Sequence, residues 1–192
     1  MRDQTMRTRQ WKRLEYERLI EAGFFQRGDK VELIGGQLMV AEPQGSRHAA
    51  TVALVADALR AAFGSGWYVM VQVPVALDDE SEPEPDVSVV PGTPREYWDA
   101  HPSRPVLVVE IADSSVALDR EYKASLYARA GVPDCWILSI EEGIVEIHRQ
   151  PVSSPDARYG WRYAGVQHLG RGATITPVAL PTASVPVADL LR

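Results

Sequence analysis

The chain has 192 residues, a formal net charge of −6 and one cysteine, Cys135. That length suits one domain with a sizeable core, and the lone cysteine excludes an internal disulfide and a cysteine-rich zinc site. An acidic chain does not bind nucleic acid through its overall charge. No apolar run reaches the roughly 18 residues that cross a bilayer, and the basic N-terminus lacks the apolar segment of a secretory signal. We therefore expect a cytoplasmic protein without a membrane partner.

Charged residues are unevenly distributed along the chain. Lys and Arg gather in residues 1–30, and Asp and Glu gather in residues 78–86. A basic segment beside an acidic site would suit a phosphate held near a metal ion, whereas each run alone is also typical of solvated surface. We expect residues 1–192 to form a single domain in which residues 1–9 are a flexible basic arm.

Apolar periodicity predicts the elements in the first half of the chain. Two segments have apolar residues at helical spacing, 10–22 and 46–63. The first of these helices is expected to bury three side chains, Leu14, Leu19 and Ile20. Residues 31–34 and 37–40, separated by Gly35 and Gly36, predict a two-residue hairpin, and residues 67–77 and 85–90 predict two further strands.

The second half of the chain predicts a pair of parallel strands. Residues 106–111 form a continuous apolar run, which is typical of a central strand covered on both faces. A helical pattern at 119–130 separates this run from another apolar strand at 135–140. A strand–helix–strand unit of this length is a right-handed crossover between parallel strands. Residues 144–149 predict an antiparallel partner, so the whole pattern indicates an α/β fold with a mixed sheet.

Three charged residues stand out because of their positions in these elements. Asp86 begins a short strand, and Glu110 lies near the C-terminal end of the apolar strand, where an unpaired buried charge would cost several kcal/mol. Lys123 lies one turn into the following helix. Two carboxylates and an ammonium at adjacent strand ends can hold a hard divalent cation and orient a water on a phosphodiester. Each residue alone is more often structural, for example an i,i+4 pair of Asp119 and Lys123, but their joint placement favours a metal site.

The motifs PDVSVV, VLVVEIADSS and DREYKASLYARAGVPDCWIL, in this order, resemble the Uma-type family of bacterial restriction-endonuclease-like proteins in the PD-(D/E)XK nuclease superfamily. VELIGGQL near the start and ATITPVALPTASVPVADLL near the end fit the same family, so the resemblance extends over about residues 10–191. It implies a restriction-endonuclease-like core, a mixed β-sheet flanked by helices, with additional C-terminal strands. It also implies an endonuclease that uses Mg²⁺ or Mn²⁺ to hydrolyse DNA and, by analogy, acts as a homodimer.

The resemblance assigns a role to each residue that matches a family motif. Asp86 is the metal-binding aspartate, and Glu110 is the acidic residue of the (D/E)XK motif. The backbone carbonyl of Ile111 is implied as a further metal ligand. The motif would place its lysine at position 112, but that residue is Ala112, so the catalytic lysine moves to Lys123 on the following helix.

Four further residues are candidates for the site. Glu32 is either an additional acidic site residue or an anchor of its hairpin, and His48 is either a site residue or a capping or surface residue. Asp113 departs from the family's Ser-Pro-Ser-like loop and either adds a ligand or caps the next segment. Tyr127 follows Lys123 by four residues, so both side chains can point toward the site from one helix face.

Two rival functions stay open at this point. One is a non-catalytic nuclease-fold module for binding or assembly, which the acidic net charge favours weakly. The other is metal-dependent hydrolysis of a phosphoester outside nucleic acids. If the site is a metal site, we expect Asp86→Asn to leave the fold intact or more stable, because its carboxylates would repel one another across a partly desolvated cleft.

Overall fold

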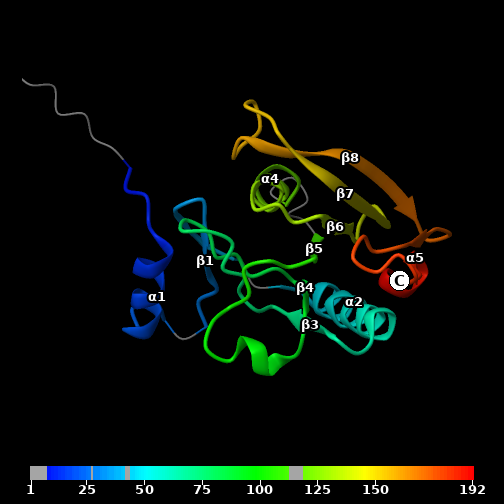
Figure 1. Ribbon diagram of the computed structural model, residues 1–192, viewed down its shortest axis with the longest axis horizontal. Helices are drawn as coiled ribbons and strands as arrows, with labels where there is room; N and C mark the ends of the chain where they lie inside the picture. The colour runs from blue at the N-terminus through cyan, green and yellow to red at the C-terminus, as the bar shows by residue number, and fades with distance from the viewer. Residues whose placement is uncertain (1–7, 27, 42–43, 113–118) are drawn as a thin grey trace, which may run out of the picture.

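A six-stranded mixed sheet forms the centre of the computed structural model, which describes residues 8–26, 28–41, 44–112 and 119–192 (Figure 1). The strands lie side by side in chain order: β3 (Trp67–Val71), β4 (Val87–Pro91), β5 (Leu107–Ala112), β6 (Asp134–Ser139), β7 (Ile144–Ser153) and β8 (Trp161–Gly170). β5 and β6 are parallel, and the other neighbouring pairs are antiparallel. The structure therefore confirms the mixed sheet, the parallel crossover and the C-terminal extension of the sheet by β8.

Helices cover both faces of this sheet. The long helix α2 (Ser46–Phe63) packs on one face together with the short α5 (Val187–Leu190). The opposite face carries η2 (Asp119–Lys123), a π-helical turn, which continues directly into α4 (Ala124–Arg129). Three smaller elements complete the C-terminal half and the connection after β4: β9 (Thr174–Ile175), β10 (Val185–Pro186) and the 3₁₀ turn η1 (Pro94–Tyr97).

Strand β5 explains how the core is divided between the two faces. Successive side chains of a strand point to opposite faces, so Leu107, Val109 and Ile111 enter the cluster beneath α2, whereas Val108 enters the cluster beneath α4. All six residues of β5 are buried, as expected for a central strand with helices on both sides. By the same alternation Glu110 lies on the α4 face, within the layer from which Lys123 comes.

The N-terminal part forms a separate small layer beside the sheet. The predicted hairpin consists of β1 (Val31–Ile34) and β2 (Gln37–Val40). Gly35 and Gly36 between them have φ angles of +56° and +79°, which is the backbone that a type I′ turn requires. A β-bridge between Leu33 and Glu82 connects the hairpin to the segment before β4.

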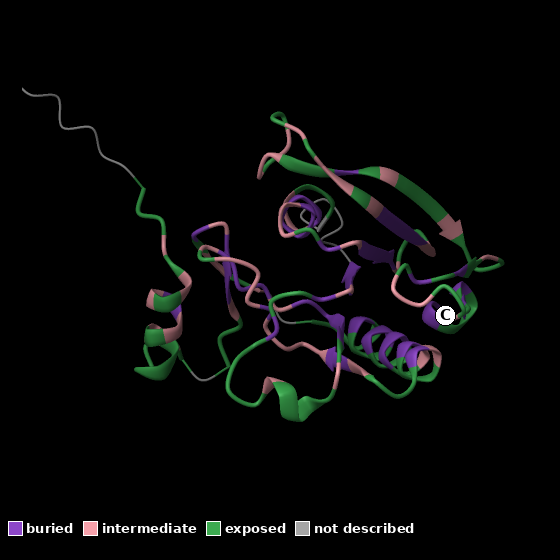
Figure 2. Cartoon of the chain, in the orientation of Figure 1, coloured by how far each residue is buried: buried purple, intermediate pink, exposed green. Residues whose placement is uncertain are grey.

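In helix α1 (Arg13–Glu21) the predicted burial of Leu14, Leu19 and Ile20 is wrong. Leu14 and Ile20 are 60% and 49% exposed, Leu19 is half-buried, and Tyr16 is the residue that the helix buries. Figure 2 accordingly shows α1 mostly in green and pink, whereas purple residues gather in the sheet and α2. Apolar spacing within α1 does not decide which of its faces packs against the rest of the chain. The packed face is the one that carries Tyr16, whose hydroxyl donates to the Val31 carbonyl at 2.5 Å.

Two other elements differ from their predictions, one in length and the other in helical form. β3 ends at Val71 rather than at residue 77, because Gln72 has a φ of +49° and leaves the extended conformation. The helix expected at 119–130 begins as a π-helical turn, a form that is frequent at functional sites. Within the part of the chain that the structure describes, no helix is both long and apolar enough to cross a bilayer.

Candidate functional site

Strand pairing places Asp86 beside Glu110. In the antiparallel pair of β4 and β5, Val87 is opposite Val109, and continuing this register by one residue puts Asp86 opposite Glu110. The amide of Ile111 donates to Asp86 Oδ2 at 2.9 Å, so the aspartate side chain caps β5 at the point where β4 begins. The two candidate acidic residues therefore occupy neighbouring positions at one end of adjacent strands.

Asp86 is held by polar side chains from separate segments. His48 Nε2, on α2, lies 3.1 Å from Asp86 Oδ2. Gln72 Nε2 and Gln44 Nε2 donate to Asp86 Oδ1 at 3.3 and 3.4 Å, and the Gln72 amide also donates to Gln44 Oε1 at 2.8 Å. Because the carboxylate must accept, His48 Nε2 carries the proton in this contact. The buried His48 is thus a partner of Asp86 rather than a capping or surface residue.

The pKa of Asp86 lies below its ordinary value despite burial. Burial acts first and disfavours the charged carboxylate, but the hydrogen bond and charge of His48 act in the opposite direction. The Ile111 amide and the charge of Lys123 add to this effect. The balance keeps Asp86 ionised, which is the protonation state that a metal-binding carboxylate needs.

Glu110 is held from the α4 face. Lys123 Nζ donates to Glu110 Oε2 at 3.2 Å, and the Tyr127 hydroxyl donates to Glu110 Oε1. Lys123 Nζ also lies 3.7 Å from Glu32 Oε2, and that same oxygen accepts the backbone amide of Glu84 at 3.1 Å. Burial, followed by the negative charge of Glu110, raises the pKa of Tyr127 well above its ordinary value, so its hydroxyl stays a donor.

Among the described residues, Glu32, Asp86 and Glu110 bring three carboxylates to this group, against the ammonium of Lys123 and the imidazole of His48. All three are buried, and burying like charges together is costly unless a cation offsets them. Carboxylate oxygens are also the donors that Mg²⁺ and Mn²⁺ prefer. The donor chemistry therefore fits a hard divalent cation. Among the described residues, however, no three His, Cys, Asp or Glu side chains are already grouped to hold one.

The structure brings most of the predicted residues together. Glu32 ties the hairpin to the segment before β4 through the Glu84 amide and also lies near Lys123, and its role as a site residue stays a prediction. Asp113 lies outside the described residues. For Ile111 the structure gives the hydrogen bond of its amide, and the role of its carbonyl stays a prediction.

Sequence reasoning missed two residues, Gln44 and Gln72. No motif marks either of them, because uncharged amides in connecting segments are common. The signal for Gln72 is conformational: its φ of +49° ends β3 and turns the chain, and its side chain then reaches Asp86.

Comparisons with known proteins show the family and the fold of the chain. A family model described as "Uma2: Putative restriction endonuclease" matches residues 13–188. A crystal structure described as "a putative nuclease belonging to DUF820" from Anabaena variabilis has a TM-score of 0.67 and 16% sequence identity, covering 90% of this chain and 96% of that one. At that identity the likeness shows the fold alone. No curated protein matches the chain.

Proposed function

The chain belongs to the Uma2 family, and on that premise we propose that it is a divalent-metal-dependent endonuclease that hydrolyses DNA phosphodiester bonds. One observation carries the proposal beyond family membership: Asp86 and Glu110 are cross-strand neighbours, and Lys123 is hydrogen-bonded to Glu110. This combination of two buried carboxylates and an ammonium is suited to a metal ion and an anionic phosphate.

Asp86 and Glu110, with the backbone carbonyl of Ile111, would hold Mg²⁺ or Mn²⁺. When bound, such an ion lowers the pKa of a coordinated water and offsets negative charge on the phosphate. The oxygen donors, the burial and the excess of carboxylates support this assignment. Glu32 and Asp113 are proposed as auxiliary acidic residues.

The remaining side chains of the site would either contact the phosphate or position the carboxylates of Asp86 and Glu110. Lys123 contributes positive charge next to Glu110 and would stabilise the anionic phosphate during attack by water. Tyr127 is a positioning residue, because its hydroxyl fixes the orientation of the Glu110 carboxylate. His48 likewise positions Asp86, and its Nδ1 is buried without a hydrogen-bond partner among the described residues.

A cleavage assay tests the proposal. Supercoiled and single-stranded DNA are incubated with the protein and Mg²⁺ or Mn²⁺, beside Asp86→Ala and a matched control, Asp57→Ala, whose carboxylate is exposed on α2. We expect nicked, linear or shortened DNA with the wild type and with Asp57→Ala, and intact DNA with Asp86→Ala or with excess chelator. Cleavage that persists in Asp86→Ala, or none on either substrate, would contradict the proposal.

A non-catalytic nuclease-fold module is the second candidate, and one observation favours it. The carboxylates of Asp86 and Glu110 already accept hydrogen bonds, and the described residues contain no ready group of three metal ligands. Calorimetric titration with Mg²⁺ and Mn²⁺ separates the candidates, because the module predicts no saturable heat.

We also propose that the chain acts on DNA in the cytoplasm as a homodimer. Two copies related by a two-fold axis can address the two strands of a duplex. Light scattering on the purified protein tests this, with a mass near twice the 21.2 kDa of the chain expected.

A further inference from the structure

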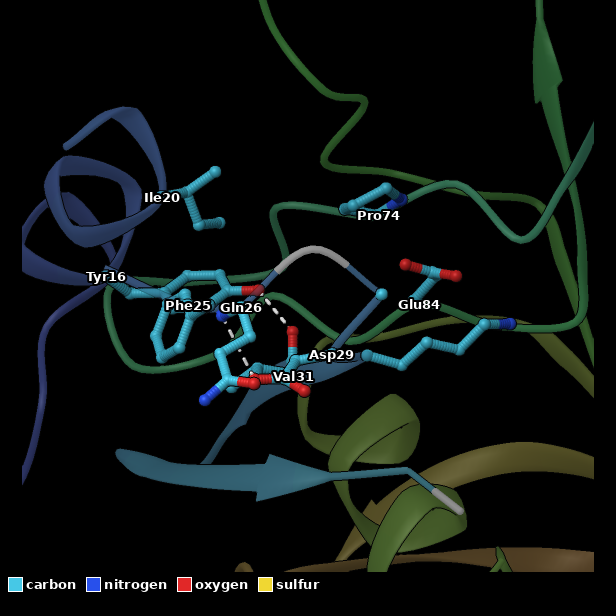
Figure 3. Close-up of a pocket in the computed structure, with 10 residues that line it drawn as sticks. Tyr16, Ile20, Phe25, Gln26, Asp29, Val31, Pro74 and Glu84 are labelled. Carbon is cyan, nitrogen blue, oxygen red and sulfur yellow. Dashed lines mark hydrogen bonds between the residues drawn. The ribbon is translucent and has the colours of Figure 1, made fainter. Parts of the chain in front are cut away.

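A pocket of about 490 Å³ is lined in part by Val31 and Glu84, which lie close in sequence to Glu32 and Asp86 of the candidate site (Figure 3). It lies between α1, the segment that leads into β1, and the chain at residues 74 and 84. Its volume falls in the range of small-molecule sites, roughly 300–1,000 Å³. The side chains that matter here are Tyr16, Phe25, Gln26, Asp29, Lys30 and Glu84.

Glu84 connects this pocket to the proposed catalytic residues. It precedes Asp86 by two residues, and its backbone amide donates to Glu32 Oε2 at 3.1 Å. That oxygen in turn lies 3.7 Å from Lys123 Nζ. A ligand in the pocket would therefore sit next to a phosphodiester that is bound at Lys123.

Aromatic rings form the wall of the pocket opposite Glu84. Figure 3 shows Tyr16 and Phe25 on one side and Pro74 with the Glu84 carboxylate on the other. The ring centroids of Tyr16 and Phe25 are 6.1 Å apart, and the Tyr16 hydroxyl is fixed on the Val31 carbonyl. Phe25 is half-buried, so part of its ring is accessible. A planar, unsaturated ligand can stack on such a ring whatever its hydrogen-bonding pattern.

The charges of the pocket decide which part of a nucleotide can enter. Glu84 and Asp29 place two carboxylates around it, and only Lys30 among its described lining residues is cationic. Carboxylates repel a phosphodiester but accept hydrogen bonds from amino groups. Lys30 and Glu84 both line this space.

We propose that this pocket binds an unpaired nucleobase bearing an exocyclic amino group, from the nucleotide that flanks the cleaved phosphodiester. The inference rests on the proposed nuclease function and names the substrate feature that the site reads. The base would stack on Phe25 and donate its amino group to Glu84. Adenine and cytosine meet this requirement, whereas thymine presents carbonyl oxygens where the amino group would be. Since paired bases are stacked inside the duplex, the base must come from a single strand or be turned out of the helix.

Binding to short labelled homopolymers, measured by fluorescence anisotropy without added metal, tests this inference independently of cleavage. Oligo-dA and oligo-dC should bind several-fold more tightly than oligo-dT. Glu84→Gln should bring this ratio close to one, because a glutamine amide can also donate to the thymine carbonyls. Glu21→Gln makes the same charge change outside the pocket and should keep the wild-type ratio.

Phe25 provides a second, independent variant. Phe25→Leu keeps an apolar side chain but loses the aromatic face, so affinity for all three strands should fall. Phe24→Leu is the matched control, because this exposed ring does not line the pocket. If Glu84→Gln does not fold, competition of oligo-dC binding by dCMP and by dTMP decides, with dCMP expected to compete better.

The outcomes separate this inference from the proposed function. A wild-type preference that Glu84→Gln abolishes and Glu21→Gln retains supports the pocket assignment. Equal affinity of the wild type for all three strands, together with metal-dependent cleavage, overturns the pocket assignment alone. A protein that neither binds nor cleaves any strand overturns both.

Discussion

Asp86 shows at the scale of one residue how a charged side chain can be buried and still be ionised. Its carboxylate accepts bonds from His48, Gln44, Gln72 and the Ile111 amide. The lowered pKa means that the surroundings of Asp86 favour its charged form. The sequence analysis led us to expect the opposite, a net repulsion among the carboxylates of this site. Such a group contributes stability above its unfolded pKa of 3.8 and loses that contribution as the pH falls through its lower folded value.

We therefore predict that Asp86→Asn lowers the free energy of unfolding at pH 7 by about 1–3 kcal/mol, since it loses hydrogen bonds to a charged acceptor. Urea denaturation at pH 7 and at pH 3 measures this, and the difference from wild type should shrink at pH 3. Asp57→Asn, with an exposed carboxylate, should change stability little. An unchanged or more stable Asp86→Asn would show that the hydrogen bonds do not outweigh repulsion.

Glu82 titrates in the opposite direction. Burial, followed by the charge of Glu17, raises its pKa to about 7, and its Oε2 has no hydrogen-bond partner among the described residues. Arg13 opposes this effect, and His101 lies 3.7 Å from Glu82 Oε1. The folded state therefore binds the proton more tightly than the unfolded chain, and stability falls as the pH rises from about 4.5 to about 7.

Glu82→Gln should remove that pH dependence. The variant is expected to be more stable than wild type at pH 8 by about 1–3 kcal/mol and to differ less at pH 5. Thermal unfolding at pH 5, 7 and 8 provides the measurement, with Glu21→Gln as the exposed control. A wild-type stability that is flat between pH 5 and 8 would contradict the prediction.

At the scale of elements, the π-helical turn η2 presents Lys123 toward Glu110 and Arg120 toward Glu146. Glu110 and Glu146 lie on one face of the sheet, because both are opposite Ile137 in the strand register. Burial raises the pKa of Glu146, but its bonds to Arg120 and His148 outweigh this and lower it. The turn η2 therefore supplies a cationic partner to each of two buried carboxylates, Glu110 on β5 and Glu146 on β7, which are not neighbouring strands.

Arg120→Ala should destabilise the fold by about 2–4 kcal/mol, because it leaves Glu146 buried without its main cationic partner. Adding Glu146→Gln to that variant should restore much of the loss. Glu142→Ala, which removes only the exposed partner of Arg120, should cost less than about 1 kcal/mol. Chemical denaturation of the four proteins forms the test, and equal effects of Arg120→Ala and Glu142→Ala would contradict it.

The elements that could be predicted from sequence are those whose apolar residues recur at the spacing of a helix or a strand, or whose turn residues are diagnostic. β5 and its parallel partner β6, the helix at 46–63 and the hairpin at Gly35 and Gly36 are of this kind. The exposed face of α1 and the early end of β3 at Gln72 could not be predicted, because tertiary contacts decide them. Asp86, Glu110 and Lys123 were singled out because strand ends and the crossover bring them together. Gln44 and Gln72 reach Asp86 from connecting segments, Gln72 through the turn that its φ of +49° makes.

At the scale of the whole molecule, the basic N-terminal segment is less available for nucleic acid than its composition suggests. Arg9 pairs with Glu15 and Lys12 pairs with Glu80, both at 2.6 Å. Arg2 and Arg7 lie outside the described residues. We predict that Arg2→Ala with Arg7→Ala flattens the salt dependence of DNA binding by up to about one unit of slope per lost phosphate contact. Arg9→Ala alone should change the slope less, and an unchanged slope in the double variant would assign the segment to solvated surface.

Metal binding should also appear in the stability of the whole molecule. Glu32, Asp86 and Glu110 are buried with Lys123 as their shared ammonium, so a divalent cation that enters this group binds the folded state and not the unfolded chain. At a concentration of 100 times its Kd, the ion would add about 2.7 kcal/mol to the free energy of unfolding. For a chain of this length that corresponds to a rise in Tm of roughly 5–10 °C.

We predict this rise for the wild type and for Asp57→Asn, and a much smaller one for Asp86→Asn, in melts with Mg²⁺ or Mn²⁺ against the same ionic strength of Na⁺. The comparison within each protein removes the intrinsic stability cost of the substitution, so a structural role of Asp86 cannot imitate the result. Surface screening cannot imitate it either, because monovalent salt is matched. A Tm that divalent ions never raise would mean that the hydrogen bonds of Asp86 and Glu110 are the final state of these carboxylates, and the non-catalytic module would replace the nuclease.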